Sequence, residues 1–317
     1  MRATWVFFAS GCLDYGVGRD PIVYGESYPA ELAGQVQQDA IVQAATPLVD
    51  ALFVIDNSCS MEEEQAALSA NFYQFMAYFD GSGLDFHVGV VSTDLDAPSH
   101  QGHLQAAGDV LFIDAHTPEP TEVFAQMAAL GTTGSGQERG LGAAYLALEV
   151  HRDTFNAGFY RDDASIHTVL ISDEQDQTQD TVISESEFVD WYSALKRSSG
   201  DRTFSSIVET YGPDAGTVYL DVSRDIGGTT WDIASADWGV VLERLGLVAS
   251  GLRREFFLSR LPVESTLDVQ IERADGSVIA GLTSGRDWTY SASRNSVTLV
   301  EIVPEPYATV RLAYAIR

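Results

Sequence analysis

The 317-residue chain has few basic residues, few cysteines and no long apolar run. It holds 18 Lys and Arg against 46 Asp and Glu, a formal net charge of -28, and Lys196 is its only lysine. A surface this acidic repels phosphate backbones and anionic lipid headgroups, which disfavours binding to nucleic acid. The composition fits instead a protein that works in salty or divalent-rich surroundings.

Other absences narrow the possible chemistry. Two cysteines are too few for a disulfide framework. Nothing beyond the N-terminal segment approaches the roughly 18 continuous apolar residues of a membrane span. The motifs G-x-S-x-G, H-E-x-x-H and G-K-[ST] do not occur, so the sequence offers no serine nucleophile elbow, zinc-protease helix or P-loop.

The N-terminus has the pattern of an export signal. A short apolar segment at 5–8 is followed by Ser10, Gly11 and Cys12, which resembles a bacterial lipobox, where the cysteine is acylated. We expect residues 1–12 to be a lipoprotein signal and Cys12 to anchor the protein at the cell envelope or outer membrane surface. A periplasmic or secreted protein is the alternative, and an ordinary N-terminus with a stray cysteine also fits.

The central part of the chain alternates between buried strands and amphipathic helices. Apolar runs at 51–55, 86–91, 167–171 and 204–208 predict strands, and weaker runs at 110–113 and 217–220 predict two more. Helical patterns follow several of these runs, with the capping-box pairs Ser60/Glu63 and Ser184/Glu187. The alternation predicts an α/β fold: a doubly wound, mostly parallel sheet with helices on both faces.

The two ends of the chain read differently. Residues 13–45 are rich in Gly, Gln and Asp and predict a tether with one short strand near 40–42. We place the large domain at 46–252. From 254 to 317 alternating apolar residues and turn signals predict a small antiparallel β module like a sandwich.

The loop that follows the strand at 51–55 carries the clearest chemical signal. Asp56, Ser58 and Ser60 alternate along it, so one carboxylate and two hydroxyls can point to a common position. Oxygen ligands of this kind suit a hard cation, Mg²⁺ first and Ca²⁺ or Mn²⁺ next. The same pattern also fits a serine-rich helix cap in which Asp56 serves the backbone.

In this loop the chain resembles the von Willebrand factor A domain family, whose metal-ion-dependent adhesion site begins with D-x-S-x-S. The resemblance covers roughly residues 46–252 and implies two more ligands. A second loop, at 131–136, implies Ser135 or Thr133 in the position of the family's threonine, and the loop at 172–174 implies Asp173. Cys59 stands where the family has a small glycine.

Two further carboxylates follow predicted strands. Asp94 comes after the strand at 86–91, and Asp176 lies in the acidic run after Asp173. Ligands gather at the carboxyl edge of open α/β sheets. Asp94 and Asp176 are therefore candidates for an outer or second cation site, although a turn aspartate in solvent fits Asp94 equally well.

These observations predict a non-catalytic, cation-dependent adhesion or scaffold module. The cation would join this acidic protein to a protein partner that presents an acidic side chain. One alternative is a metal-dependent hydrolase acting on a phosphorylated substrate, and the other is a structural envelope protein stabilised by its cation.

Overall fold

The computed structural model describes residues 35–317 except 44–47, 80–83, 180–181, 214, 235–236 and 301. The predicted signal at 1–12, its Cys12 and the tether up to residue 34 lie outside the described residues. Within the described part of the chain, no helix is both long and apolar enough to cross a membrane.

The larger part of the molecule is built on a five-stranded parallel sheet with the strand order β3-β2-β4-β5-β6. Phe53 in the middle of β2 pairs in register with Val90 of β3 and Val169 of β4. Both faces of β2 are covered, which explains its unbroken apolar run. The four main predicted strands are confirmed, and the strands are β2 (Leu48–Ile55), β3 (Asp85–Ser92), β4 (Ser165–Ser172), β5 (Arg202–Val208) and β6 (Thr230–Asp232).

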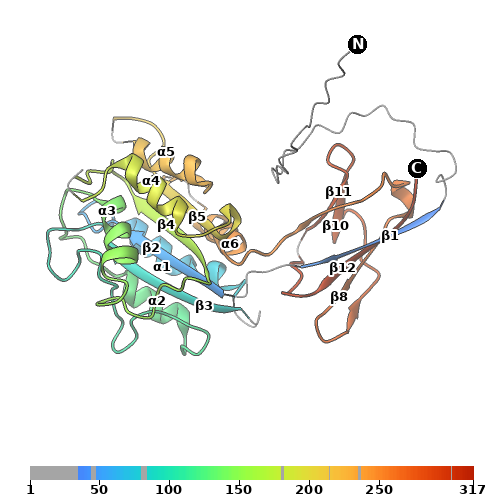
Figure 1. The fold of residues 1–317 in the computed structure, drawn as a ribbon, viewed down its shortest axis with the longest axis horizontal. Coiled ribbons are helices and arrows are strands. Elements are labelled where there is room, and N and C mark those ends of the chain that lie inside the picture. The colour runs from blue at the N-terminus through green and yellow to red at the C-terminus, as the bar shows by residue number, and fades with distance from the viewer. Residues whose placement is uncertain are drawn as a thin grey trace, which may run out of the picture.

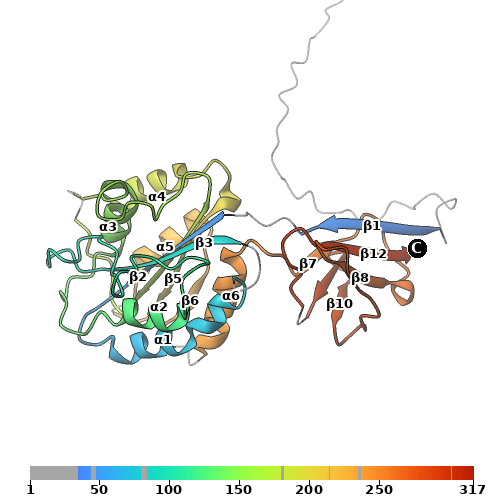
Figure 2. The ribbon, with the colours of Figure 1, turned by 90° about the horizontal axis from the view of Figure 1, so that it is seen from below.

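Helices cover both faces of this sheet (Figures 1 and 2). Phe53 and Ile55 of β2 point into a core formed with α1, α2 and α6, whereas Leu52 and Val54 point into a second core formed with α3, α4 and α5. The predicted α/β class is therefore confirmed as a mixed fold with one parallel sheet. The helices are α1 (Glu62–Met76), α2 (Pro120–Ala128), α3 (Gly140–Tyr145) continued by a π-helical turn (Leu146–Val150), α4 (Glu185–Ala194), α5 (Thr217–Ile226) and α6 (Trp238–Ala249).

The predicted strand at 217–220 is wrong, because these residues begin helix α5. Its buried residues are Tyr219, Val222, Ser223 and Ile226, which is the spacing of one helical face. The β-branched and aromatic residues at its start mimic a strand, and the helical spacing shows only over ten residues. Gly227, with φ of 101°, ends the helix.

Two smaller predictions also fail. Residues 110–113 form no strand: Ile113 makes an isolated antiparallel bridge with Val88, and Val110 bridges back to Ala107. The Ser60/Glu63 capping box is absent, since α1 begins at Glu62 with Met61 as its N-cap. The Ser184/Glu187 capping box of α4 is confirmed.

The C-terminal part forms two antiparallel sheets that share one hydrophobic core, as predicted for 254–317. One sheet has the order β10-β11-β7 and the other β1-β12-β8-β9. The strands are β7 (Glu255–Phe257), β8 (Asp268–Glu272), β9 (Val278–Ile279), β10 (Trp288–Ser291), β11 (Ser296–Leu299) and β12 (Thr309–Ala315).

Strand β1 (Val36–Val42) corrects the predicted tether. We expected residues 13–45 to be a tether with one short strand near 40–42, but all seven residues of β1 pair antiparallel with β12. Ile41 packs against the core of the β sheets, which a free tether could not do. The large α/β region is therefore an insertion between β1 and β7.

The chain crosses between the two regions twice, and the crossings are bonded to each other. The side-chain amide of Gln43 donates to the carbonyls of Arg253 at 2.9 Å and Pro304 at 3.1 Å. The guanidinium of Arg254 donates to the Tyr78 hydroxyl at 2.8 Å and to Glu243 at 3.2 Å. These contacts tie the base of β7 to helices α1 and α6.

Candidate functional site

The strand order creates a crevice at the carboxyl ends of β2 and β4. After β2 the chain forms β3 on one side, and it returns to form β4 on the other side of β2. Loops that leave two adjacent parallel strands in opposite directions open a gap where ligands bind. Asp56 follows β2 and Asp173 follows β4, so the two predicted ligands face this gap from its two sides.

Asp56 is fully buried and already holds two donors. Its Oδ1 accepts the Ser58 N–H at 2.7 Å, and its Oδ2 accepts the Ser172 hydroxyl at 2.7 Å across the gap. Burial raises the pKa of Asp56; the hydrogen bonds from Ser172 and Ser58 act against this rise, and the nearby Asp173 adds to it. Asp56 therefore lies beside a second carboxylate in a place shielded from water.

Three more predicted ligands surround this carboxylate. The hydroxyls of Ser58 and Ser60 lie 3.1 Å apart on the loop, the first buried and the second exposed. Cys59, between them, is an exposed free thiol. One carboxylate oxygen of Asp173, Oδ1, is buried and receives no hydrogen bond. These residues supply oxygen atoms only, which is the ligand chemistry of a hard cation.

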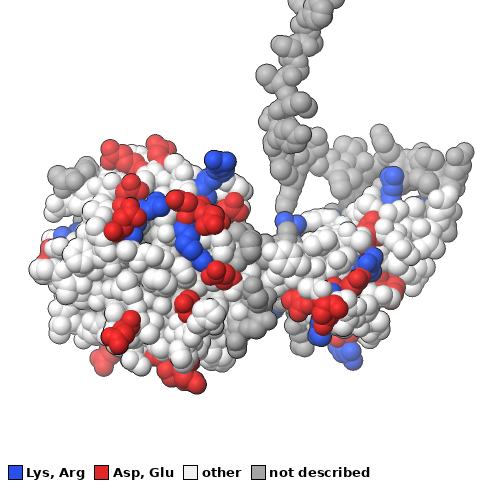
Figure 3. All heavy atoms as spheres, turned by 60° about the horizontal axis from the view of Figure 1, so that its bottom comes forward, with Lys and Arg blue, Asp and Glu red and all other residues white. Residues whose placement is uncertain are grey.

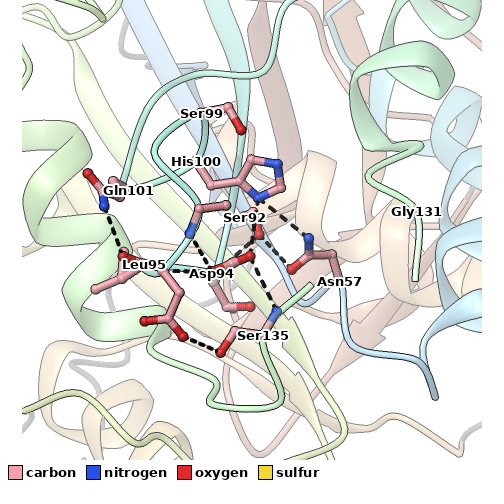
Figure 4. A network of polar contacts seen from close by, with 12 residues as sticks. Asn57, Ser92, Asp94, Leu95, Ser99, His100, Gln101, Gly131 and Ser135 are labelled. Atoms are coloured by element: carbon pink, nitrogen blue, oxygen red, sulfur yellow. Dashed lines mark hydrogen bonds and ion pairs between the residues drawn. The ribbon is translucent and has the colours of Figure 1, made fainter. Parts of the chain in front are cut away.

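The second predicted loop makes different contacts. Ser135 donates its hydroxyl to Asp96 at 2.7 Å and its backbone N–H to Asp94 at 3.3 Å (Figure 4). Thr133 is exposed on the same loop. The contacts of Ser135 thus bind the second loop to the loop after β3, and neither predicted residue is hydrogen-bonded to Asp56.

Asp94 organises that loop. It is buried, and it accepts backbone N–H groups of Asp96 at 2.7 Å, Ala97 at 3.2 Å and Ser135 at 3.3 Å. The Nδ1 atom of His100 lies 3.9 Å from its Oδ2. With these donors in place, the carboxylate of Asp94 serves the backbone, so the contacts favour a structural role over a second cation site.

Asp176, the other outer candidate, is also engaged by the backbone. It accepts the N–H of Leu141 at 3.2 Å, at the start of α3, and the hydroxyl of Thr178 at 2.9 Å. Burial raises the pKa of Asp176, and the hydrogen bonds from Leu141, Thr178 and Tyr219 act against this rise. Asp176 therefore caps α3 and joins it to the loop after β4.

Asn57 joins three loops and was not anticipated from the sequence. Its side-chain oxygen accepts the Ser92 hydroxyl at 2.8 Å, and its backbone carbonyl accepts the Gly134 N–H at 3.0 Å. A Cβ atom on Gly134 would lie 2.2 Å from that side-chain oxygen. The approach of the second loop to Asn57 therefore requires glycine at position 134.

Glu138 was missed as well. It is fully buried and accepts a hydrogen bond from the Thr93 hydroxyl, and it is hydrogen-bonded to the carboxyl of Asp56. Burial, and next the charge of Asp56, raise the pKa of Glu138 to about 8. The available signal was its position: a glutamate directly before the apolar helix that starts at Gly140, in a loop already assigned to the site.

The described residues include no group of three or more His, Cys, Asp or Glu side chains arranged to hold a metal ion. A cation at this edge would therefore need oxygens of other kinds as well. The hydroxyls of Ser58 and Ser60, together with water, can supply them, so the residues present fit a hard cation.

Comparisons with known proteins give only distant likenesses. No family model matches the sequence, and no curated protein does. Proximal thread matrix protein 1 from the mussel byssus shares 14% identity over 71% of this chain and 52% of that chain, with a TM-score of 0.41. The pilus adhesin SpaC from Lactobacillus rhamnosus GG shares 10% identity over 90% of this chain and 42% of that chain, with a TM-score of 0.45. The chain spans about half of the first protein and less of the second.

Proposed function

We propose that this protein is an envelope-anchored, divalent-cation-dependent binding module of the von Willebrand factor A type, with no reaction of its own. Mg²⁺ is the proposed cation, with Ca²⁺ and Mn²⁺ as alternatives, and Cys12 is the proposed anchor. The proposal is supported by the D-x-S-x-S loop, which lies at the carboxyl edge of a parallel sheet that helices cover on both faces. This is the setting that the resemblance implies for an adhesion site.

The pairing of Asp56 with Asp173 is the observation that carries the proposal. The two carboxylates are close enough for Asp173 to raise the pKa of Asp56, and Asp173 Oδ1 is buried without a hydrogen bond. Like charges in a shielded place cost free energy unless a proton or a cation lies between them. With Ser58 and Ser60 on the same loop, a cation can satisfy both carboxylates together.

A cation held in this way can also bind a partner. Mg²⁺ prefers six oxygen ligands, and two carboxylates with two hydroxyls leave positions for water or for an outside group. A carboxylate of a partner protein can replace such a water. The cation then bridges two acidic surfaces that would otherwise repel each other, so the proposed partner is a protein that presents an acidic side chain.

Calorimetric titration of Mg²⁺ into the full chain tests this function. We expect saturable binding that is lost in both Asp56→Ala and Asp173→Ala, because each removes a carboxylate ligand. Asp109→Ala is the matched control, since Asp109 is exposed and lies outside the site. Equal weak binding by all four proteins would contradict the proposal. Phosphoester hydrolysis that needs Mg²⁺ and Asp56 would favour the hydrolase instead.

A further inference from the structure

Glu138 has more reason to face a cation than either residue expected from the second loop. Its side chain is fully buried, its Oε2 accepts the Thr93 hydroxyl, and its Oε1 has no donor. The carboxyl faces that of Asp56 closely enough to share a hydrogen bond with it. Two carboxyl groups held together in the interior are stable only with a proton or a cation between them.

The backbone around Glu138 fixes this arrangement from two sides. The carbonyl of Glu138 accepts the Gln177 N–H at 2.6 Å, from the loop after β4. The next residue, Arg139, donates its N–H to the carbonyl of Thr93 at 3.3 Å. Thr93 in turn donates to the carbonyl of Ile55, directly before Asp56, at 3.1 Å. The loops after β2, β3 and β4 therefore all position the Glu138 carboxyl beside Asp56.

We propose that Glu138 is a third carboxylate ligand of the cation and takes the part expected of Ser135 or Thr133. This inference rests on the proposed function, since it concerns the same site. Ser135 uses its hydroxyl on Asp96, and Thr133 lies exposed on the loop, whereas Glu138 brings an unpartnered oxygen to Asp56. Asp173 brings the other unpartnered oxygen from the opposite side of the gap.

A third carboxylate changes which cation the site prefers. Mg²⁺ sites in proteins generally use one or two carboxylates, whereas Ca²⁺ takes more oxygen ligands and binds more tightly as the ligand charge increases. With Asp56, Asp173 and Glu138 the site carries three negative charges around a divalent ion. The geometry therefore favours Ca²⁺ over Mg²⁺, and Glu138 is the residue that sets this preference.

The test compares Ca²⁺ and Mg²⁺ titrations of the full chain with those of Glu138→Gln. The amide keeps the size of the side chain and removes its charge. We expect the Ca²⁺ affinity to fall by at least about tenfold, the loss typical of metal-site substitutions, and the Mg²⁺ affinity to fall less. Glu122→Gln is the matched control, because Glu122 is an exposed glutamate on α2.

The outcomes separate this inference from the proposed function. If the wild type and Glu122→Gln bind Ca²⁺, Asp56→Ala does not, and Glu138→Gln binds as the wild type does, Glu138 only shares a proton with Asp56 and the inference is wrong, while the proposed function stands. Absence of saturable binding in the wild type would overturn both. Should Glu138→Gln fail to fold by circular dichroism, Glu138→Asp replaces it: an affinity equal to the wild type's contradicts the inference, and a weaker one supports it.

Discussion

At the scale of single residues, Gly134 controls how closely the second loop approaches the site. Its N–H donates to the carbonyl of Asn57 at 3.0 Å, and its Cα hydrogen points at the Asn57 amide. A methyl group there would meet three side-chain atoms of Asn57 at 2.2–2.4 Å. Asn57 cannot move away freely, because it also accepts the Ser92 hydroxyl.

Gly134→Ala should therefore lower the free energy of unfolding by about 1–3 kcal/mol, the usual cost of overpacking a buried contact. The control is Gly136→Ala, two residues further along the same loop, because nothing lies within 4 Å of its added Cβ atom. Urea unfolding followed by circular dichroism measures both. A Gly134→Ala protein as stable as Gly136→Ala would show that the second loop adjusts without cost.

The predicted residues of the site divide according to where their signal lies. Asp56 could be predicted, because the strand before it and the serines after it are adjacent in sequence. Glu138 and Asn57 could not, because their roles depend on the meeting of loops more than 35 residues apart, as in the contacts from Thr93 to Glu138 and from Ser92 to Asn57. Ser135 fits the pattern of the second loop, but its contacts with Asp94 and Asp96 depend on the loop after β3.

At the scale of elements, β1 shows how local patterns mislead. Most of its residues are partly exposed because it lies at the edge of a sheet, so its sequence is polar enough to read as a tether. Its partner β12 lies more than 260 residues away, and only that pairing reveals the strand. The buried strands β2 to β5 carry their own apolar runs and were predicted without knowledge of their partners.

Asp39 holds β1 to the rest of the β sheets. Its carboxylate accepts the Ser259 N–H at 2.9 Å, the Ser259 hydroxyl at 2.6 Å and the Tyr314 hydroxyl at 2.7 Å. Burial alone would raise the pKa of Asp39, but the hydrogen bonds from Ser259 and Tyr314 outweigh it and lower the pKa. The ionised form is thus the one that the folded protein stabilises, and this stabilisation is present above the ordinary pKa of 3.8 and lost as the pH falls through the lowered value.

Asp39→Asn should weaken this attachment by about 1–3 kcal/mol, because the amide brings donors to a place that already holds three donors. Hydrogen exchange measures the effect locally: the amides of β1 and β12 should exchange faster, while those of β2 and β4 stay unchanged. Asp268→Asn, an exposed aspartate on β8, is the control. Unchanged protection of β1 would mean that its backbone pairing suffices.

At the scale of the whole molecule, the β sheets and the candidate site lie at opposite ends. β2 runs away from its junction with the β sheets, so Asp56 at its carboxyl end lies about 26 Å from its start by the rise of a strand. Figure 1 shows the same arrangement: the β sheets lie to one side of the α/β region, and β1 begins at the far end of them. An anchor ahead of β1 would thus present the site outward.

The charge of the molecule is spread over its surface. On the face drawn in Figure 3, acidic and basic side chains occur together in small groups with uncharged surface between them. The net charge of -28 therefore acts mainly as general repulsion, which opposes the compact state and which any salt screens. A cation in the site acts differently, because it binds the folded chain alone and stabilises it by mass action.

The two effects can be separated by thermal unfolding. Raising NaCl from low to high concentration should increase the melting temperature of the wild type and of Asp56→Ala alike, because screening does not depend on the site. At constant ionic strength, millimolar Mg²⁺ or Ca²⁺ should stabilise only the wild type, by about 2.7 kcal/mol when the cation is at 100 times its dissociation constant. Equal stabilisation of both proteins by the divalent ion would mean that it meets only the acidic surface. In that case the carboxyl groups of Asp56 and Glu138 would be held together by a proton alone.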